Sequence, residues 1–313
     1  MKNRPIGIFD SGVGGLTVLM KVKKALPKES VIYVGDTANA PYGGKSHEDL
    51  LQHGRDMIRF LQRQNVKAVV LACGTTSSTV YEQLVAECDL PLVDVIRPGV
   101  KACAELAGQN QPVPQTSDAK VREEQAAQNS GLRVGLIATA ATIKSGLFER
   151  LLKAKRPDIS LLTQACPLFA PMVEAGITQG TVAKWAAETY IGEWRDKIDA
   201  LVLGCTHYPM LADTLKEVLG ADVQFINLAS YTAQALKDRL VAIDGLNDSN
   251  ATPIYKYYVS GNPDAFNNTA RFLLNSNPRA ERLTSFCQHK SIEERSDEAI
   301  QAWIASLRSM LLS

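Results

Sequence analysis

Short apolar segments alternate with helix-like segments along most of this chain, and this alternation limits the possible folds more than any other feature. Similar segments recur in both halves of the sequence. Such βαβα alternation predicts an α/β fold with mostly parallel sheets covered by helices. The expected strands cover 6–9, 31–34, 69–72, 92–95, 133–138, 159–163 and 200–203, and the expected helices 16–25, 47–64, 76–87, 146–155, 181–194 and 210–219.

The composition excludes several classes of protein. The chain has 313 residues, enough for one or two domains, and a net charge of +1 from 34 basic and 33 acidic residues. Nothing in this balance favours nucleic acid as a partner. We find no signal peptide and no apolar run long enough to span a membrane, so we expect a cytoplasmic protein with reduced thiols. The absence of a CxxC pair argues against a zinc site.

Two cysteines share closely similar surroundings. Cys73 follows the apolar run 69–72 and precedes Gly-Thr-Thr, and Cys205 follows 201–204 and precedes Thr206 and His207. Each therefore ends a buried strand, where open α/β sheets bind their ligands. Either cysteine alone also fits a buried small hydrophobic residue. The matching pair instead suggests a site with a thiol on each side.

Two loop segments carry further candidates. Asp10 ends the first strand and is followed by a glycine-rich turn, which can bring backbone N–H groups close to an anion. Its spacing does not fit a dinucleotide fingerprint and lacks the lysine of a P-loop. Asp10 fits either a helix cap or a base, and the loop 35–46 fits either a binding loop or a simple connection.

Three polar residues outside these segments are also candidates. Glu174 stands in an apolar run and lies either on the outer face of a turn or buried near the site. Thr139 and Thr142 follow another strand, where their hydroxyls could bind a substrate or cap a helix.

Six segments together resemble the glutamate racemases of bacterial cell-wall synthesis, within the cofactor-independent aspartate/glutamate racemase family. The matching segments are FDSGVGGLTV at 9–18, GDTANAPYGGKS at 35–46, LACGTTSS at 71–78, PLVDVIRPG at 91–99, CPLFAPMVEAG at 166–176 and LGCTHYP at 204–210. The resemblance implies two similar parallel-sheet domains that face each other across a cleft. One would comprise 1–97 and 208–313, and the other 98–207 with a polar insertion at 108–131; we expect the tail from 291 to form a helix.

The resemblance also implies a two-base isomerase that needs no cofactor and no metal. Cys73 would act on D-glutamate with help from Asp10, and Cys205 on L-glutamate with help from His207, with Glu174 nearby. We also expect a homodimer that supplies D-glutamate for peptidoglycan, acts on a small amino acid and binds neither nucleic acid nor membrane. The implied substrate contacts are Asp10, Ser11, Tyr42, Gly43, Gly74, Thr75, Thr139, Thr142, Thr206 and His207.

One position departs from the family pattern. Gly74 stands where the family usually has Asn, which removes a side-chain amide from the expected site. This departure keeps open a racemase for aspartate or for a broader set of amino acids. A binding protein that has lost turnover and a hydrolase or transferase with one nucleophilic cysteine are further alternatives. The single-nucleophile alternative leaves the second thiol unexplained.

Overall fold

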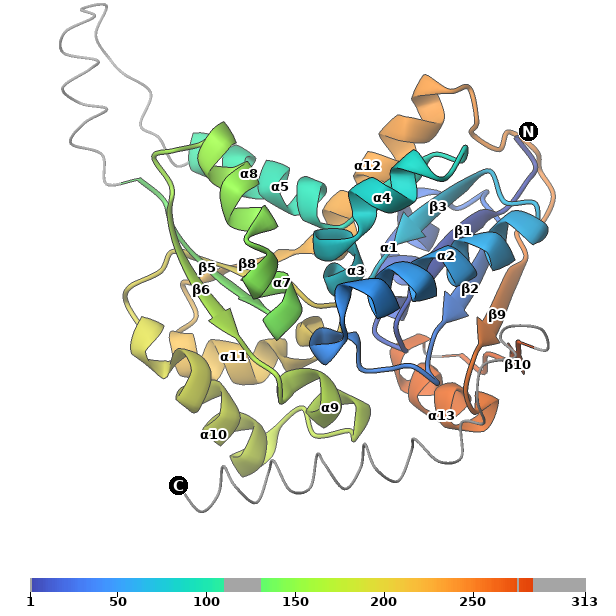
Figure 1. Cartoon of the computed structure of the whole chain (residues 1–313). Helices are drawn as coiled ribbons and strands as arrows, with labels where there is room; N and C mark the ends of the chain where they lie inside the picture. The colour runs from blue at the N-terminus through green and yellow to red at the C-terminus, as the bar shows by residue number, and fades with distance from the viewer. Residues whose placement is uncertain (1, 110–130, 275, 284–313) are drawn as a thin grey trace, which may run out of the picture. The chain divides into compact units, whose positions relative to one another are not determined.

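The structure is a computed structural model that describes residues 2–109, 131–274 and 276–283 (Figure 1). The described residues up to Arg282 form one compact unit. It contains a six-stranded sheet, ordered β10-β9-β2-β1-β3-β4, and a four-stranded sheet, ordered β6-β5-β7-β8. All pairings of these strands are parallel, which confirms the predicted α/β class. The predicted terminal helix and positions 110–130 of the predicted insertion lie outside the described residues.

The strands and helices follow the predicted alternation. The strands are β1 (Ile6–Asp10), β2 (Val31–Gly35), β3 (Ala68–Leu71), β4 (Leu92–Asp94), β5 (Arg133–Ala138), β6 (Ser160–Ala165), β7 (Ala200–Leu203), β8 (Gln224–Asn227), β9 (Tyr255–Val259) and β10 (Ala280–Arg282). The α-helices are α1 (Leu16–Ala25), α2 (His47–Arg63), α3 (Gly74–Thr79), α4 (Tyr81–Ala86), α5 (Ile96–Gln109), α7 (Ala140–Ser145), α8 (Leu147–Lys155), α9 (Phe169–Glu174), α10 (Gly180–Ile191), α11 (Ala212–Leu219), α12 (Leu228–Ala242) and α13 (Pro263–Leu274). Short 3₁₀ helices are η1 (Tyr42–Gly44), η2 (Gly192–Trp194) and η3 (Tyr208–Leu211).

The helix predicted over 76–87 is divided into α3 and α4. Val80 interrupts it with φ −125° and ψ 4°, outside the α-helical range. In α3 the Thr79 hydroxyl donates to the Thr75 carbonyl at 2.7 Å, and the Ser78 hydroxyl donates to the same oxygen at 3.1 Å. Such bonds from short hydroxyl side chains compete with regular helix formation, so a boundary in this Ser/Thr-rich segment has a physical cause.

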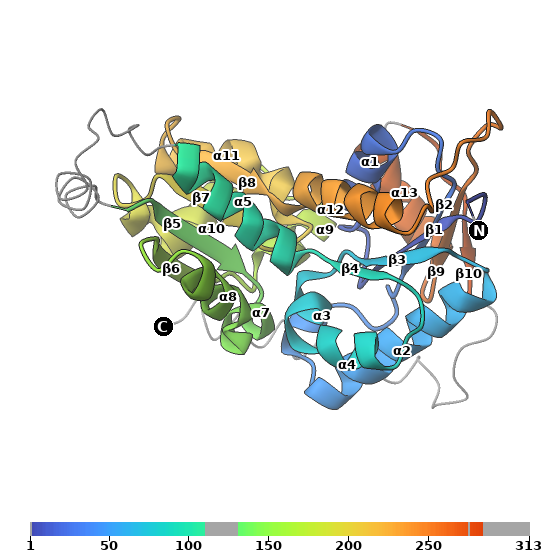
Figure 2. The same ribbon diagram turned by 90° about the horizontal axis from the view of Figure 1, so that it is seen from above.

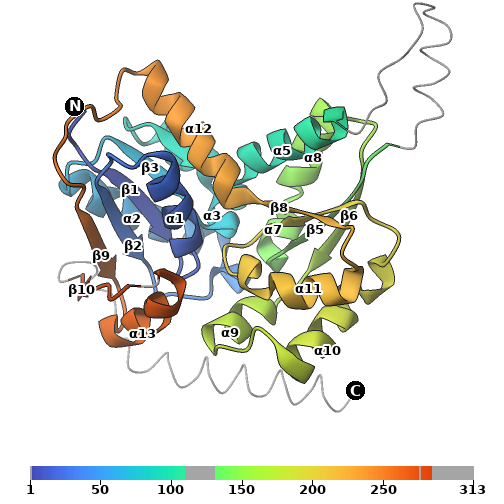
Figure 3. The same ribbon diagram turned by 180° about the vertical axis from the view of Figure 1, so that it is seen from behind.

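Helices cover both faces of the six-stranded sheet. Alternation along β1 sends Ile6 and Ile8 into the core beneath α1. Gly7 faces the other way, where a Cβ would stand 3.0 Å from the Leu61 side chain of α2. Helices α12 and α13 contact α1, whereas α3 and α4 contact α2 (Figures 1 and 3). The sheet is therefore buried on both sides, as its almost uninterrupted apolar strands require.

The four-stranded sheet has the same layered construction. Val134 and Leu136 of β5 belong to one core with residues of α5 and α8, while Ile137 belongs to a second core with residues of α10 and α11. Helix α12 contacts both α1 and α5, and so joins the helical layers of the two sheets (Figure 2). One hydrophobic core extends from the first sheet through these helices to the second.

The limits of the two predicted domains remain a prediction. Strand β8 pairs with β7 in the four-stranded sheet, so the chain stays with this sheet beyond the expected crossing at 207. It returns to the six-stranded sheet only with β9. Within the described ranges, none of the helices combines the length and apolar character needed to cross a membrane.

Candidate active site

The two cysteines occupy equivalent positions in the two sheets. Cys73 lies two residues after the end of β3, which pairs with β1, and Cys205 lies two residues after the end of β7, which pairs with β5. Each is therefore at the carboxyl end of a central strand, the usual place for a ligand in a parallel sheet. Cys73 is 5% exposed and Cys205 9% exposed.

Cys205 is the first of three side chains that contact one another in a row. Its Sγ lies 3.6 Å from Nδ1 of His207, and Nε2 of His207 lies 3.0 Å from Oε1 of Glu174. Burial lowers the pKa of His207, but its hydrogen bonds to Cys205 and Glu174 more than offset burial and hold this pKa well above the usual range. These hydrogen bonds favour the protonated imidazole, and through its two ring nitrogens His207 links Cys205 to Glu174.

Cys73 lies in different surroundings. Its thiol donates to the Ser11 hydroxyl across 3.6 Å. Burial raises the pKa of Cys73 to about 11, and the negative charge of Asp10 raises it further in the same direction, against weaker opposing contributions from hydrogen bonds to Thr76 and Ser11. This thiol therefore carries its proton at neutral pH and can act as a proton donor.

Asp10 is buried beside Cys73 in the glycine-rich turn. Its Oδ2 accepts backbone hydrogen bonds from Gly12 at 3.2 Å and Gly15 at 2.9 Å. Its Oδ1 is buried and has no hydrogen-bond partner among the described residues. Burial raises the pKa of this carboxyl, while the charge on His207 lowers it. Asp10 therefore organises the turn, but the N-cap of α1 is Gly15 without a side-chain cap bond, so the predicted capping role is not observed and the role as a base stays a prediction.

The glycine-rich turn packs against residues from the other sheet. A Cβ on Gly14 would lie 2.5 Å from Oγ1 of Thr206 and 2.7 Å from the His207 ring, and one on Gly12 would lie 3.1 Å from Oε1 of Glu174. Protein side chains therefore occupy the space that the missing glycine side chains leave. This explains why the turn needs its glycines although it has no nucleotide-binding spacing.

Hydroxyl groups form a second bridge between the sheets. The Oγ1 atoms of Thr75 and Thr139 are 2.8 Å apart, and those of Thr139 and Thr142 are 3.0 Å apart. The Ser78 hydroxyl donates to Oγ1 of Thr142 at 3.3 Å. Thr139 also caps α7 by accepting from the Thr142 backbone, so the predicted capping role is confirmed. Thr75 and Ser78 of this hydroxyl cluster follow closely after Cys73 in sequence.

Tyr42 and Gly43 reach the site from the loop after β2. The Tyr42 hydroxyl donates to Oδ2 of Asp36 at 2.5 Å, and a Cβ on Gly43 would lie 3.1 Å from Cβ of Thr139. Asp36 is buried and also accepts from Ser260 at 2.6 Å and from Asn39 at 3.0 Å. Asp36 is not among the site residues predicted from the sequence. An acid directly after a buried strand, as at Asp10, is the signal that could have identified it.

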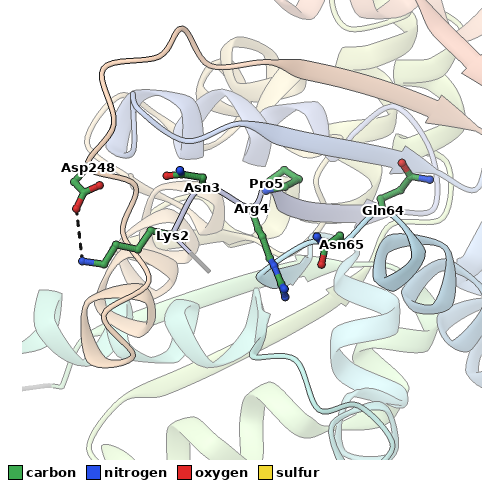
Figure 4. Close-up of a pocket in the computed structure, with 7 residues that line it drawn as sticks. All are labelled: Lys2, Asn3, Arg4, Pro5, Gln64, Asn65 and Asp248. Carbon is green, nitrogen blue, oxygen red and sulfur yellow. Dashed lines mark ion pairs between the residues drawn. The ribbon is translucent and has the colours of Figure 1, made fainter.

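A separate pocket lies at the opposite, amino end of the same strands. It is lined by the segment 2–5, which precedes β1, by Gln64 and Asn65, which precede β3, and by Asp248 (Figure 4). Lys2 and Asp248 form an ion pair at 3.7 Å within it. The pocket contains no thiol, so it is not the candidate active site. Among the residues that the structure describes, no group of three His, Cys, Asp or Glu side chains could hold a metal ion.

The structure thus brings together the side chains predicted for the site. Asp10, Ser11 and Cys73 come from one sheet, and Cys205, His207 and Glu174 from the other. Thr75 and Thr139 connect the two sides. This arrangement defines a class of α/β protein in which each of two parallel sheets carries a buried thiol just beyond a strand end. The catalytic roles assigned to the residues stay predictions.

Comparisons with known proteins identify the family. The model for Asp/Glu/Hydantoin racemases matches residues 110–236. A glutamate racemase of Geobacter metallireducens is 38% identical over 84% of this chain and 90% of that protein. The chain belongs to the glutamate racemase family.

Solved structures agree with this assignment. Glutamate racemase from Francisella tularensis in complex with D-glutamate has a TM-score of 0.77 at 32% identity and covers 91% of this chain and 98% of its own. The Thermus thermophilus enzyme in complex with β-chloro-D-alanine has a TM-score of 0.74 at 35% identity, covering 90% and 97%. The two-sheet fold of this chain is therefore that of the family.

Proposed function

We propose that this chain interconverts L- and D-glutamate by a two-thiol proton transfer that needs no added cofactor. The observation that carries the proposal is the pair of buried thiols at the ends of β3 and β7, each with its own acidic or basic neighbour. The named relatives are glutamate racemases, which supports glutamate as the substrate. The D-glutamate would serve peptidoglycan synthesis, as the family resemblance implies.

In the direction from L- to D-glutamate, the Cys205 thiolate takes the α-proton from one face. The electron pair of the broken C–H bond passes into the neighbouring carboxylate, and the Cys73 thiol then donates its proton to the opposite face. The raised pKa of Cys73 suits a proton donor, and the imidazole of His207 lies 3.6 Å from Cys205, where it can assist proton transfer. The reverse direction exchanges the two roles, with Asp10 beside Cys73.

The α-proton of an amino acid is a very weak acid, so the site must stabilise charge that develops in the transition state. The Thr75 and Thr139 hydroxyls are placed to donate to the substrate carboxylate, where negative charge accumulates. The nearly complete burial of both thiols excludes water and strengthens these interactions. Substrate would exchange the hydroxyl–hydroxyl bond at this point for bonds to its own oxygens.

Deuterium exchange tests the proposal. The purified chain is incubated with L-glutamate in deuterium oxide without added cofactor, and circular dichroism of the amino acid and α-deuteration are followed. Racemisation with deuterium in the D-product is expected, and a Cys73→Ser variant should lose it. No exchange with glutamate would refute the proposal. Exchange with L-aspartate alone would support the aspartate alternative, which the Gly74 departure keeps open.

A further inference from the structure

The two loops that carry the thiols touch through their backbones at a pair of glycines. A Cβ built on Gly74, the residue after Cys73, would lie 2.5 Å from the carbonyl oxygen of Gly204, the residue before Cys205. A carbon and an oxygen in ordinary contact are separated by more than 3 Å, so any side chain at position 74 would push the carbonyl away. The contact partner is backbone and cannot rotate aside as a side chain could.

Both glycines are anchored to their own sheets. The Gly204 amide donates to the Ile137 carbonyl at 2.8 Å, and a Cβ on Gly204 would lie 2.7 Å from that oxygen. On the other side, the Ala72 amide donates to the Phe9 carbonyl at 2.8 Å, and the Cys73 carbonyl accepts from Ser77 at 2.9 Å. Neither loop can yield without disturbing its sheet or helix, so the contact sets the distance between the loops.

Polar bonds hold the loops together near this contact. The Thr17 hydroxyl donates to the Thr206 carbonyl at 3.2 Å, and the hydroxyls of Thr75 and Thr139 are 2.8 Å apart. Both bonds join a segment of the first sheet to a segment of the second. They keep the glycine backbones in contact, and both thiols are buried in this arrangement.

We propose that Gly74 is a positioning residue that sets the separation of the two thiols by allowing the loops to meet. This inference rests on the proposed function, since the separation matters only if both thiols act on one substrate. The Asn that the family usually carries here would contribute an amide, but in this chain its Cβ would meet the Gly204 carbonyl. Gly74 therefore exchanges a side-chain contact for a closer approach of the two loops.

The test uses Gly74→Ala in the full chain, with Gly108→Ala as the matched control. A Cβ on Gly108 of α5 would meet nothing within 4 Å. Because a misplacement of about 1 Å can lower a rate on the order of 100-fold, kcat/KM for glutamate should fall between about 10- and 100-fold in Gly74→Ala. The loss should fall mainly on kcat, since substrate still binds. Gly108→Ala should retain wild-type kinetics.

A second readout does not depend on activity. Iodoacetamide labelling, followed by peptide mass spectrometry, gives the alkylation rate of each thiol. Cys73 and Cys205 should react faster in Gly74→Ala than in the wild type, while the half-buried Cys88 serves as the internal reference. Unchanged labelling together with unchanged kinetics in a folded Gly74→Ala variant would overturn the positioning role.

The two proposals can fail separately. If the wild type racemises no amino acid, the proposed function fails, but the labelling comparison still decides whether Gly74 holds the loops together. If Gly74→Ala does not fold, the wild type is labelled without substrate in buffer and in urea. Strong protection of both thiols in buffer supports the closed contact, and equal rates in buffer and urea refute it.

Discussion

The Glu174–His207 pair allows a direct test of whether the Glu174 carboxylate stabilises the protonated form of His207. Glu174→Gln keeps the size of the side chain and removes its charge. The carboxylate lies 3.0 Å from Nε2 of His207, which is 5% exposed, whereas Glu174 is 41% exposed. A hydrogen bond to a charged group contributes about 1.5–3 kcal/mol when buried. Because water screens the exposed carboxylate, we take about 1–1.5 kcal/mol for this pair.

This energy predicts both the kinetic and the stability effect. If it acts on the transition state, kcat/KM should fall about 5- to 13-fold. L- and D-glutamate have equal free energies in water, so kcat/KM must fall by the same factor in both directions. The folded-state pKa of His207 is raised above its unfolded value of about 6.5, so its contribution to stability is complete below that pH and is lost as pH rises through the folded pKa.

The assay compares Glu174→Gln with Glu188→Gln. Glu188 is also 41% exposed and pairs with Arg195 at 3.2 Å, but it lies outside the candidate site. At pH 6 the melting temperature of Glu174→Gln should be about 1.5–2.5 °C below the wild type, and this difference should shrink as pH rises through the folded-state pKa of His207. Glu188→Gln should keep the wild-type kcat/KM. Equal kcat/KM in all three proteins, or a deficit in melting temperature that grows with pH, would refute the reasoning.

Two further predictions concern single buried groups. The pKa of Cys73 is raised to about 11, so its alkylation rate in the native chain should rise nearly tenfold between pH 9 and pH 10. In urea, where the thiol has its ordinary pKa, the rate should level off over the same range. Equal pH profiles in the native chain and in urea would contradict the raised pKa. Lys67 is fully buried and pairs with Glu29 at 2.5 Å, so Lys67→Met should lower the free energy of unfolding by about 3–5 kcal/mol in urea titrations. Lys101→Met, which affects the exposed pair with Glu105, should cost about 0.5 kcal/mol or less, and equal losses in the two variants would contradict the burial argument.

The layered fold could be predicted because its central strands are buried on both sides. The segments that became β1, β2, β3 and β7 are nearly continuous apolar runs, which is the pattern of a parallel sheet between helices. Three other strands were not predicted. β8 and β10 are short and partly exposed, and β9 mixes lysine with half-buried tyrosines. Their pairing depends on neighbours far along the chain, which no local pattern records.

The candidate site was also predicted only in part, because some of its contacts join residues far apart in the sequence. The matching strand ends predicted Cys73 and Cys205 as a pair, and the carboxyl edge of one parallel sheet accounts for the closeness of Asp10 and Cys73. The position of Glu174 could not be decided, since its contact with His207 joins residues 33 positions apart across a helix and a strand. The Gly74–Gly204 contact was also beyond sequence reasoning. It depends on how two sheets approach each other, and two glycines with no side chains leave no pattern to read.

The unequal surroundings of the two thiols remain compatible with equal catalysis in both directions. Under the proposed two-thiol mechanism, the protonated Cys73 is the proton donor in the resting protein and Cys205 is the thiol that removes the proton of L-glutamate. In the same proposal D-glutamate requires the Cys73 thiolate, which the raised pKa of Cys73 makes the rarer form. The same raised pKa, however, makes this thiolate a stronger base than an ordinary one. Since kcat/KM must be equal in the two directions, the greater reactivity of the rarer form has to offset its lower population. The unequal surroundings of the two thiols therefore determine which protonation form predominates before substrate binds. They cannot favour one enantiomer as product.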